Sequence, residues 1–287
     1  MKKEKTPKSP SRGLSRRRFL QWTGLGLGGA ALGNAFLREP TALQIERLDT
    51  PLSKAPAGTQ VRVVQLSDTH IGQFRPYFRR VAEVANALQP DIILLTGDYI
   101  EESRNLPAAL EFLRLLRASA GIFAVQGNWE YWARIEGEPL RRHFKKIGIT
   151  LLTNQREDVQ AGGMELSLLG LDYPSRESDL LALQEQANPE RVNLLLSHVP
   201  AFSHEKLDGR IDLICCGHTH GGQVRLPFFS PLYLPRYTGG FVSGLYRVGP
   251  TATPLYVNRG IGTSLLPVRF LCRPEITLFN LTGKAEG

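Results

Sequence analysis

The chain has 287 residues, of which 42% are hydrophobic and 22% are charged, and its formal net charge is +8. This length accommodates one large α/β domain, and the apolar fraction is sufficient for a sizeable core. Most of the positive charge lies at the amino terminus. Residues 1–40 carry nine basic and two acidic residues, which leaves 26 basic and 25 acidic residues for the remainder. Because that remainder is almost neutral, a broad basic surface for DNA or RNA is excluded, and no nucleic-acid partner is expected.

Residues 1–37 have the pattern of an export signal. A tail rich in Lys, Arg, Ser and Pro precedes Arg16-Arg17-Arg18-Phe19-Leu20, and a Gly-rich apolar run extends from Trp22 to Leu37. Adjacent arginines followed by Phe-Leu and a weakly apolar run resemble a twin-arginine signal, so the twin-arginine translocation machinery is a predicted partner. The run is marginal for a membrane span, and small residues around Asn34 would permit cleavage. The segment therefore predicts a cleaved signal or a retained anchor, on a protein of the periplasm or of the outer face of the cytoplasmic membrane.

Residues 38–60 are predicted to be a linker, because Pro40, Pro51 and Pro56 discourage regular structure. From residue 61 onward, apolar runs typical of strands alternate with helical patterns. The expected helices cover 76–89, 107–118, 138–147 and 178–187. The expected strands cover 61–66, 91–96, 121–125, 149–152, 164–171, 192–197 and 211–216, followed by 222–226, 240–247, 254–258 and 275–281. This order predicts one α/β domain over 61–287, in which two stacked sheets have helices outside them.

Five of the strand-like runs end in potential metal ligands. In chain order these side chains are Asp68 and His70, Asp98, Asn128, His198, and His218 with His220. Sites in layered α/β proteins collect outside the carboxyl ends of strands, so the seven groups are predicted to converge. Seven groups exceed what one tetrahedral ion needs, and nitrogen and oxygen ligands without thiolate favour Mn, Fe or Zn. Two ions are therefore predicted. The alternative for His218 and His220 is a pair of hydrogen-bonded loop histidines without a metal.

These motifs together resemble the calcineurin-like metallophosphoesterase family over residues 61–281. The resemblance is carried by Asp68-x-His70, Gly97-Asp98, Gly127-Asn128, His198 and Gly217-His218-x-His220. It implies a four-layer α/β/β/α sandwich of two mixed sheets flanked by helices. It also implies two divalent or trivalent transition-metal ions, one held by Asp68, His70, Asp98 and His220 and the other by Asp98, Asn128, His198 and His218. Asp98 would bridge the ions, and Asp98, Asn128 and His218 are the predicted catalytic residues.

The resemblance implies a hydrolase that cleaves phosphodiester or pyrophosphate bonds with a metal-activated water. The segments 217–223 and 255–276 are similar to exported, envelope-associated phosphodiesterases, among them enzymes that cleave UDP-2,3-diacylglucosamine and wall-associated phosphoesterases exported by the twin-arginine route. This similarity favours a phosphorylated small molecule or a lipid as substrate, and a membrane surface as a further candidate partner. The alternatives are a phosphomonoesterase or protein phosphatase, and a degenerate metal-binding scaffold.

One position departs from the family pattern. The family usually has a histidine after its Gly-Asn pair, with the implied role of stabilising the transition state or protonating the leaving group, whereas this chain has Trp129. Indole carries no proton that titrates near neutral pH, so general-acid assistance from this position is absent. Trp129 is predicted to line the substrate site, with packing in the core as the alternative. Arg259 is predicted to contact substrate. Arg259, His204 and Arg269 are candidates for the missing donor, although a structural role is favoured for each. Specificity is predicted to lie in loops 99–106, 129–138 and 172–178.

Overall fold

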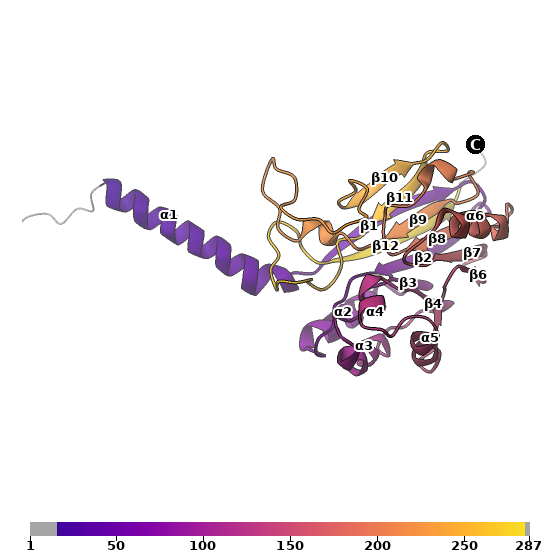
Figure 1. The fold of residues 1–287 in the computed structure, drawn as a ribbon. Helices are drawn as coiled ribbons and strands as arrows, with labels where there is room; N and C mark the ends of the chain where they lie inside the picture. Colours follow the sequence, from indigo (N-terminus) through magenta and orange to yellow (C-terminus); the bar gives the residue numbers. More distant parts are fainter. Residues whose placement is uncertain (1–15, 285–287) are drawn as a thin grey trace, which may run out of the picture.

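Two six-stranded sheets pack face to face in the computed structural model, which describes residues 16–284 (Figure 1). The first sheet has the strand order β1-β12-β2-β3-β4-β5, in which β2 to β5 run parallel and β12 runs antiparallel to β2. Its strands are β1 (Gln44–Leu52), β2 (Gln60–Leu66), β3 (Ile92–Thr96), β4 (Gly121–Val125), β5 (Ile149–Leu151) and β12 (Glu275–Gly283).

The second sheet has the order β10-β11-β9-β8-β7-β6, and it is also mixed. Strands β7, β8, β9 and β11 are parallel, whereas β6 and β10 form antiparallel edges. Its strands are β6 (Gln155–Ala161), β7 (Met164–Leu171), β8 (Val192–Ser197), β9 (Leu213–Cys216), β10 (Gly244–Val248) and β11 (Thr253–Val257).

Helices cover the outer face of each sheet and complete four layers. The first sheet packs on α2 (Pro76–Ala87), α3 (Leu106–Leu113) and α5 (Glu138–Lys145), and the second packs on α6 (Glu177–Gln186). The α/β/β/α sandwich is therefore confirmed.

The continuous apolar runs of the central strands follow from this layering. Side chains alternate across a strand, so every second residue faces the opposite side. In β3, Ile92 and Leu94 pack between the two sheets, whereas Ile93 and Leu95 pack under the helices. Because both faces of the strand are covered, no polar alternation is required, and the run is apolar throughout.

The linker predicted over residues 38–60 is wrong, because Gln44–Leu52 form strand β1. This strand pairs in parallel with β12 along its whole length. It lies at the edge of the sheet, where a proline such as Pro51 needs no partner for the hydrogen bond that it cannot donate. Prolines therefore did not exclude a strand here.

Three further differences concern short elements. Residues 155–161, which carry little apolar signal, form β6 as a hairpin partner of β7. The strand expected at 222–226 is reduced to one bridge between Val224 and Phe270. A five-residue helix, α4 (Asn128–Trp132), begins directly after β4. Each of these elements is specified by its neighbours in space more than by its own sequence pattern.

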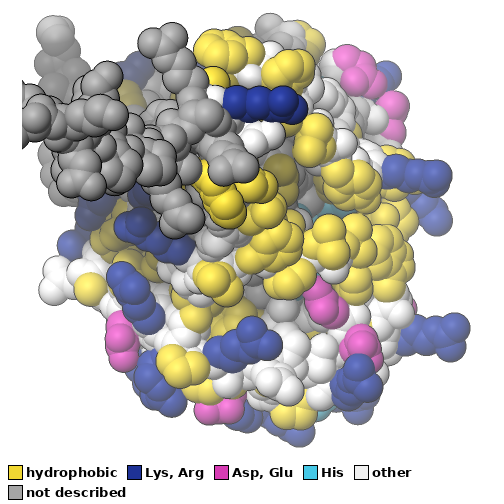
Figure 2. All heavy atoms as spheres, turned by 90° about the vertical axis from the view of Figure 1, so that its left-hand side faces the viewer, with side chains coloured by type: hydrophobic (Ala, Val, Ile, Leu, Met, Phe, Trp, Pro, Cys, Tyr) yellow, Lys and Arg dark blue, Asp and Glu magenta, His cyan; other side chains and the backbone are white. Residues whose placement is uncertain are grey.

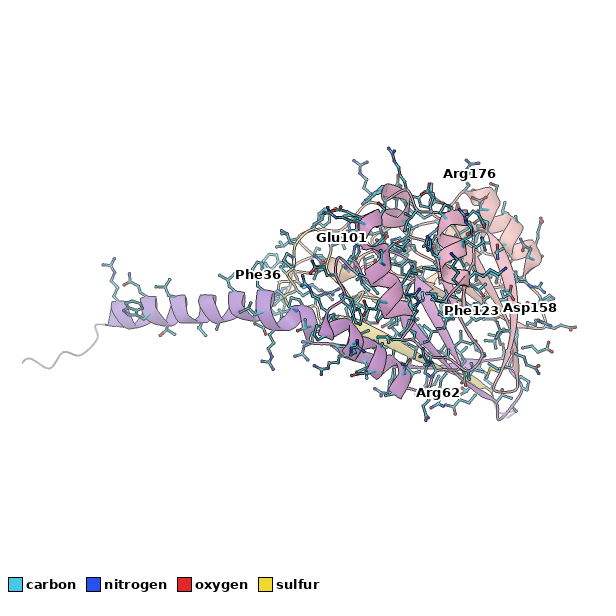
Figure 3. The ribbon with its side chains drawn as sticks, turned by 90° about the horizontal axis from the view of Figure 1, so that it is seen from below. Phe36, Arg62, Glu101, Phe123, Asp158 and Arg176 are labelled. Atoms are coloured by element: carbon cyan, nitrogen blue, oxygen red, sulfur yellow. The ribbon has the colours of Figure 1, made fainter. Side chains whose placement is uncertain are left out.

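A single helix, α1 (Arg16–Gly33), projects from the domain (Figure 1). Figure 3 shows Phe36 where α1 joins the domain, and Arg62, near the start of β2, farther from that end. The parallel strands of the first sheet therefore run toward the end of the domain from which α1 leaves. Among residues 16–284, no helix combines the length and the hydropathy needed to cross a membrane.

Candidate metal centre

The loops after β2, β3, β4, β8 and β9 bring all seven predicted ligands into one buried cluster, in which no side chain is more than 6% exposed. The carboxylate of Asp98 lies at its middle. Asp98 Oδ2 is 3.6 Å from His70 Nε2 on one side and 3.2 Å from His198 Nε2 on the other. Asp98 thus contacts both halves of the cluster.

The ligands form two groups, one on each side of Asp98. In the first group, His220 Nε2 lies 3.0 Å from His70 Nε2 and 3.6 Å from Asp68 Oδ1. In the second group, His198 Nε2 lies 3.0 Å from Asn128 Oδ1 and 3.1 Å from His218 Nδ1. Two sets of His and Asp ligand atoms are therefore close enough to bind a cation each, Asp68 with His70 and His220, and Asp98 with His198 and His218. This division agrees with the one implied by the motifs.

Most of these ligands adopt a backbone conformation that L-residues avoid. Positive φ angles occur at Asp68 (49°), His70 (42°), Asp98 (57°), His218 (73°) and His220 (51°). Such conformations cost free energy, and they persist where the surrounding fold fixes them, commonly at functional sites. The surrounding fold therefore fixes these side chains in positions that local backbone preference alone would not select.

Glycine is required at position 97 because the ligand side chains are packed closely around it. It precedes Asp98 with φ of +91°, and a Cβ atom there would lie 2.6 Å from His198 Nδ1. That nitrogen is also 2.8 Å from the carbonyl oxygen of Thr96, which orients the imidazole so that its Nε2 faces Asp98.

Glu130 joins the Asp98 loop to the helix that carries Asn128. Its carboxylate accepts backbone N–H bonds from Asp98 and Tyr99, at 3.0 and 2.7 Å. It also accepts the N–H of Gly127 at 2.8 Å, which caps the first turn of α4. Asp98 Oδ1 in turn accepts the N–H of Trp129 at 2.9 Å. These four bonds fix the relative positions of two predicted ligands, Asp98 and Asn128.

Burial controls the protonation of the histidines. It lowers the pKa of His70 and of His218 to about 4, and it places the pKa of His220 well below the usual value. All three are therefore neutral at pH 7, which is the form that binds a metal. Burial alone would also lower the pKa of His198, but the charge of Asp98 outweighs it and raises that pKa to about 9.

Two carboxylates are buried in the cluster. Within the described part of the chain, Asp68 and Asp98 form ion pairs with histidines and with no Lys or Arg. Burial, together with the charge of Asp98, raises the pKa of Asp68 to about 7. Buried carboxylates normally need a paired cation.

The donor set fits two transition-metal ions. It contains carboxylate, amide and imidazole groups without thiolate, which suits Mn, Fe or Zn. The facing Nε2 atoms of His70 and His220 support this fit, because two neutral rings 3.0 Å apart can share at most one proton, whereas a cation accepts both lone pairs. The cations would also compensate the two buried carboxylates.

A cavity of about 730 Å³ opens above the cluster. Asp98, Asn128, His218 and His220 form part of its wall, so a ligand in the cavity would contact both metal-binding groups. This volume lies within the usual range for small-molecule sites.

Aromatic rings form much of the remaining wall. Trp129 lines the cavity, with its ring centroid 5.4 Å from that of His70 and 5.1 Å from that of Trp132. Tyr173 and Tyr237 also line it, and their rings lie 6.4 Å apart. The structure therefore places Trp129 on the wall of the cavity and not in the core.

Arg259, predicted to contact substrate, does not line the cavity. Its guanidinium forms ion pairs with Glu46 and Glu275, each at 2.6 Å. The prediction is corrected accordingly: the charge of Arg259 is already neutralised by two carboxylates, and the side chain joins β1 to β12.

The other two candidate proton donors also have structural roles. Arg269 is fully buried and donates to backbone carbonyls of Arg259, Gly260, Gly262 and Cys272. His204 packs between Phe202 and Phe241. Neither lines the cavity.

Two loops that the sequence did not predict as part of the site line the cavity. Residues 222–237 and 264–268 contribute Gln223, Leu232, Tyr233 and Leu266 among others, whereas no residue of the expected loop 99–106 does so. His218 Nε2 anchors the first of these loops through the carbonyl oxygen of Arg236, at 2.6 Å. Aromatic and leucine side chains in a Pro-rich segment directly after the histidine motif were the available signal.

Comparisons with known proteins lead to the same family as the sequence motifs. The sequence model of the family described as Calcineurin-like phosphoesterase matches residues 61–222. An uncharacterized metallophosphoesterase, YkuE of Bacillus subtilis, is 31% identical over 93% of this chain and 98% of its own length. The phosphodiesterase YaeI of Escherichia coli is 32% identical over 93% of this chain and 99% of its own.

Metal binding should release protons from this cluster. At pH 7 His198, whose pKa is raised to about 9, is protonated, and the raised pKa of Asp68 makes that carboxyl hold a proton more readily than a free one; a bound cation must displace these protons. We expect about one proton or more to be released when Mn²⁺ saturates the chain, and affinity to rise between pH 6 and pH 8. Calorimetric titration at pH 7 in buffers of different ionisation enthalpy measures this number. Binding without proton release, or affinity that falls as pH rises, would contradict the assignment.

Proposed function

Because the chain belongs to the calcineurin-like phosphoesterase family, we propose that it hydrolyses phosphodiester or pyrophosphate bonds with two metal ions. The observation that carries this proposal is the pair of ligand groups that share Asp98 beneath one cavity. The chain is a metallophosphoesterase, and its similarity to a protein named as a phosphodiesterase supports the choice of bond.

The protein residues of the site have separable tasks in this reaction. When bound, the two cations would polarise a phosphoryl group and activate the attacking water. Asp98 Oδ2 contacts a histidine of each group, so its carboxylate would help to hold both cations. Asn128 and His218 line the cavity, and we assign them to the same catalytic unit. Nitrogen and oxygen ligands make Mn, Fe or Zn the proposed metals.

The residue at position 129 affects which leaving groups the site can expel. Indole at this position donates no titratable proton, so a leaving group that must be protonated would depart slowly. Cleavage of a pyrophosphate releases a phosphate whose second pKa is about 6, and this group leaves as a stable anion near neutral pH. The substitution at Trp129 thus supports a pyrophosphate or an activated diester in preference to an alkyl phosphate.

The cavity also supports a substrate with an apolar part. Leu232, Leu265, Leu266 and Val268 line it beside the aromatic rings. A phosphate at the metal-binding groups would place the rest of the substrate against these side chains. We therefore propose a phosphorylated small molecule or a lipid of the cell envelope as the substrate.

Export through the twin-arginine route is part of the same proposal. The adjacent residues Arg16 and Arg17 precede an apolar run, and that run lies in a helix that projects from the domain. This route carries folded proteins, which suits a chain whose metals are bound before export. The location that follows is the periplasm or the outer face of the cytoplasmic membrane.

Replacing Asp98 tests the hydrolase proposal. Asp98→Asn removes the charge shared by both groups, and we expect it to lower metal content and to reduce kcat/KM for bis-p-nitrophenyl phosphate roughly a hundredfold or more. The matched control is Asp208→Asn, an exposed carboxylate in the loop before β9, which should leave both quantities unchanged. Wild-type turnover by Asp98→Asn with a full complement of metal would overturn the assignment.

Replacing both arginines of the signal tests the location. We expect Arg16→Lys together with Arg17→Lys to retain the protein in the cytoplasm, because the translocation machinery distinguishes the two side chains. The purified variant should hydrolyse bis-p-nitrophenyl phosphate at the wild-type rate. Cell fractionation measures the distribution, and normal export of the double variant would show that the basic segment is not a signal.

A further inference from the structure

Two loops at the mouth of the cavity expose large apolar side chains. We define the apolar collar as Phe228, Phe229, Leu232, Tyr233, Leu265 and Leu266, and each of these side chains is at least 61% exposed. Figure 2 shows hydrophobic side chains gathered on the face of the domain from which α1 leaves. Extended apolar patches on soluble domains normally mark a surface that something covers.

The collar is continuous with the cavity. Leu232 and Tyr233 from the first loop and Leu265 and Leu266 from the second line the cavity together with His218 and His220. A partner that covers the collar therefore lies at the mouth of the site. This position favours a partner that also supplies the substrate.

The collar also lies beside the end of α1. The carbonyl oxygen of Ala35 accepts the N–H of Arg269 at 3.0 Å, and Glu39 Oε1 accepts the N–H of Cys272 at 2.6 Å. These bonds attach the residues just after α1 to the loop residues that follow Leu266. Apolar side chains of α1, such as Leu25 and Leu27, are also more than 60% exposed. The apolar interior of a lipid bilayer is extensive enough to cover both the helix and the collar.

The segment of the chain that carries the collar is basic. No Asp or Glu occurs between Asp212 and Glu275, whereas six arginines do. Arg259 and Arg269 are engaged inside the domain, but Arg236 and Arg273 are exposed. Arginines next to Phe, Leu and Tyr side chains suit the boundary between anionic headgroups and acyl chains.

We propose that the apolar collar docks on the surface of an anionic lipid bilayer, so that the mouth of the cavity faces the membrane. The collar inserts among the acyl chains while the neighbouring arginines contact the headgroups. The proposal of a docking surface rests only on the exposure of the collar side chains and on the charge of the arginines near them. The entry of a lipid substrate from the membrane rests, in addition, on the proposed function.

A single fluorescent label reports this docking. Cys215, Cys216 and Cys272 are buried, so the full chain with Phe228→Cys can be labelled at one exposed thiol with a polarity-sensitive nitrobenzoxadiazole group. We expect its emission to shift to the blue and to rise roughly twofold or more with vesicles of equal parts phosphatidylglycerol and phosphatidylcholine. The response should weaken with phosphatidylcholine alone and at high salt.

The matched control separates the collar from α1. Leu181 lies on the outer helix α6 and is 41% exposed, so Leu181→Cys labels the opposite region of the same chain. Its emission should not change with vesicles. If the chain sediments with vesicles but the label at 228 does not respond, α1 alone mediates binding and the proposal is wrong. A response that depends on protein concentration without vesicles would identify a second copy as the occupant and would also overturn it.

A second variant measures the contribution of the collar to binding. Phe228→Ser with Phe229→Ser should lower the partition coefficient onto the anionic vesicles by about tenfold or more. Neither residue lines the cavity, so hydrolysis of soluble bis-p-nitrophenyl phosphate should remain at the wild-type rate. Unaltered partitioning would contradict the docking surface.

The two proposals fail separately in these assays. A chain that responds at position 228 but hydrolyses no phosphoester with Mn, Fe or Zn would overturn the proposed function and leave the docking surface intact. A chain that hydrolyses the soluble ester, but whose label at position 228 shows no change in emission with vesicles, would overturn the docking surface alone.

Discussion

The buried carboxylate of Asp98 is the constraint on which the rest of the site depends. It lies 3.6 and 3.2 Å from histidines that follow two different strands, and within residues 16–284 no lysine or arginine forms an ion pair with it. The charge of His198 lowers the pKa of Asp98, although burial acts in the opposite direction, so the carboxylate stays ionised. An ionised carboxylate this deeply buried needs positive charge beside it, which protonated His198 supplies and which a bound metal would replace when that histidine becomes a ligand.

The fold supplies the positions of these ligands from elements that are distant in the chain. Parallel strands end together, so β2, β3, β4, β8 and β9 deliver side chains to one place although they span about 150 residues. Positive φ angles at five ligands turn the chain sharply at those ends. Glu130 then ties the Asp98 loop to α4. The free energy of packing two sheets and their helices maintains this strained arrangement.

The sequence predicted the elements whose structure is determined by their own residues and immediate neighbours in the chain. Apolar runs such as 192–197 are buried on both faces and were predicted without further context. The histidine and aspartate motifs at their ends named the side chains that the fold brings together. The prediction failed where the environment decides. The edge position of β1 tolerates Pro51, and Glu46 and Glu275 neutralise Arg259. The loops 222–237 and 264–268 reach the cavity only through tertiary contacts such as that between His218 and the carbonyl oxygen of Arg236.

Anomalous X-ray scattering from crystals of the chain loaded with Mn²⁺ tests most directly whether Asp98 joins two metal sites. We predict two anomalous peaks about 3.5–4 Å apart with Asp98 between them. One peak should lie near His70 and His220, and the other near His198 and His218. A single peak, or two peaks that Asp98 does not contact, would contradict the account.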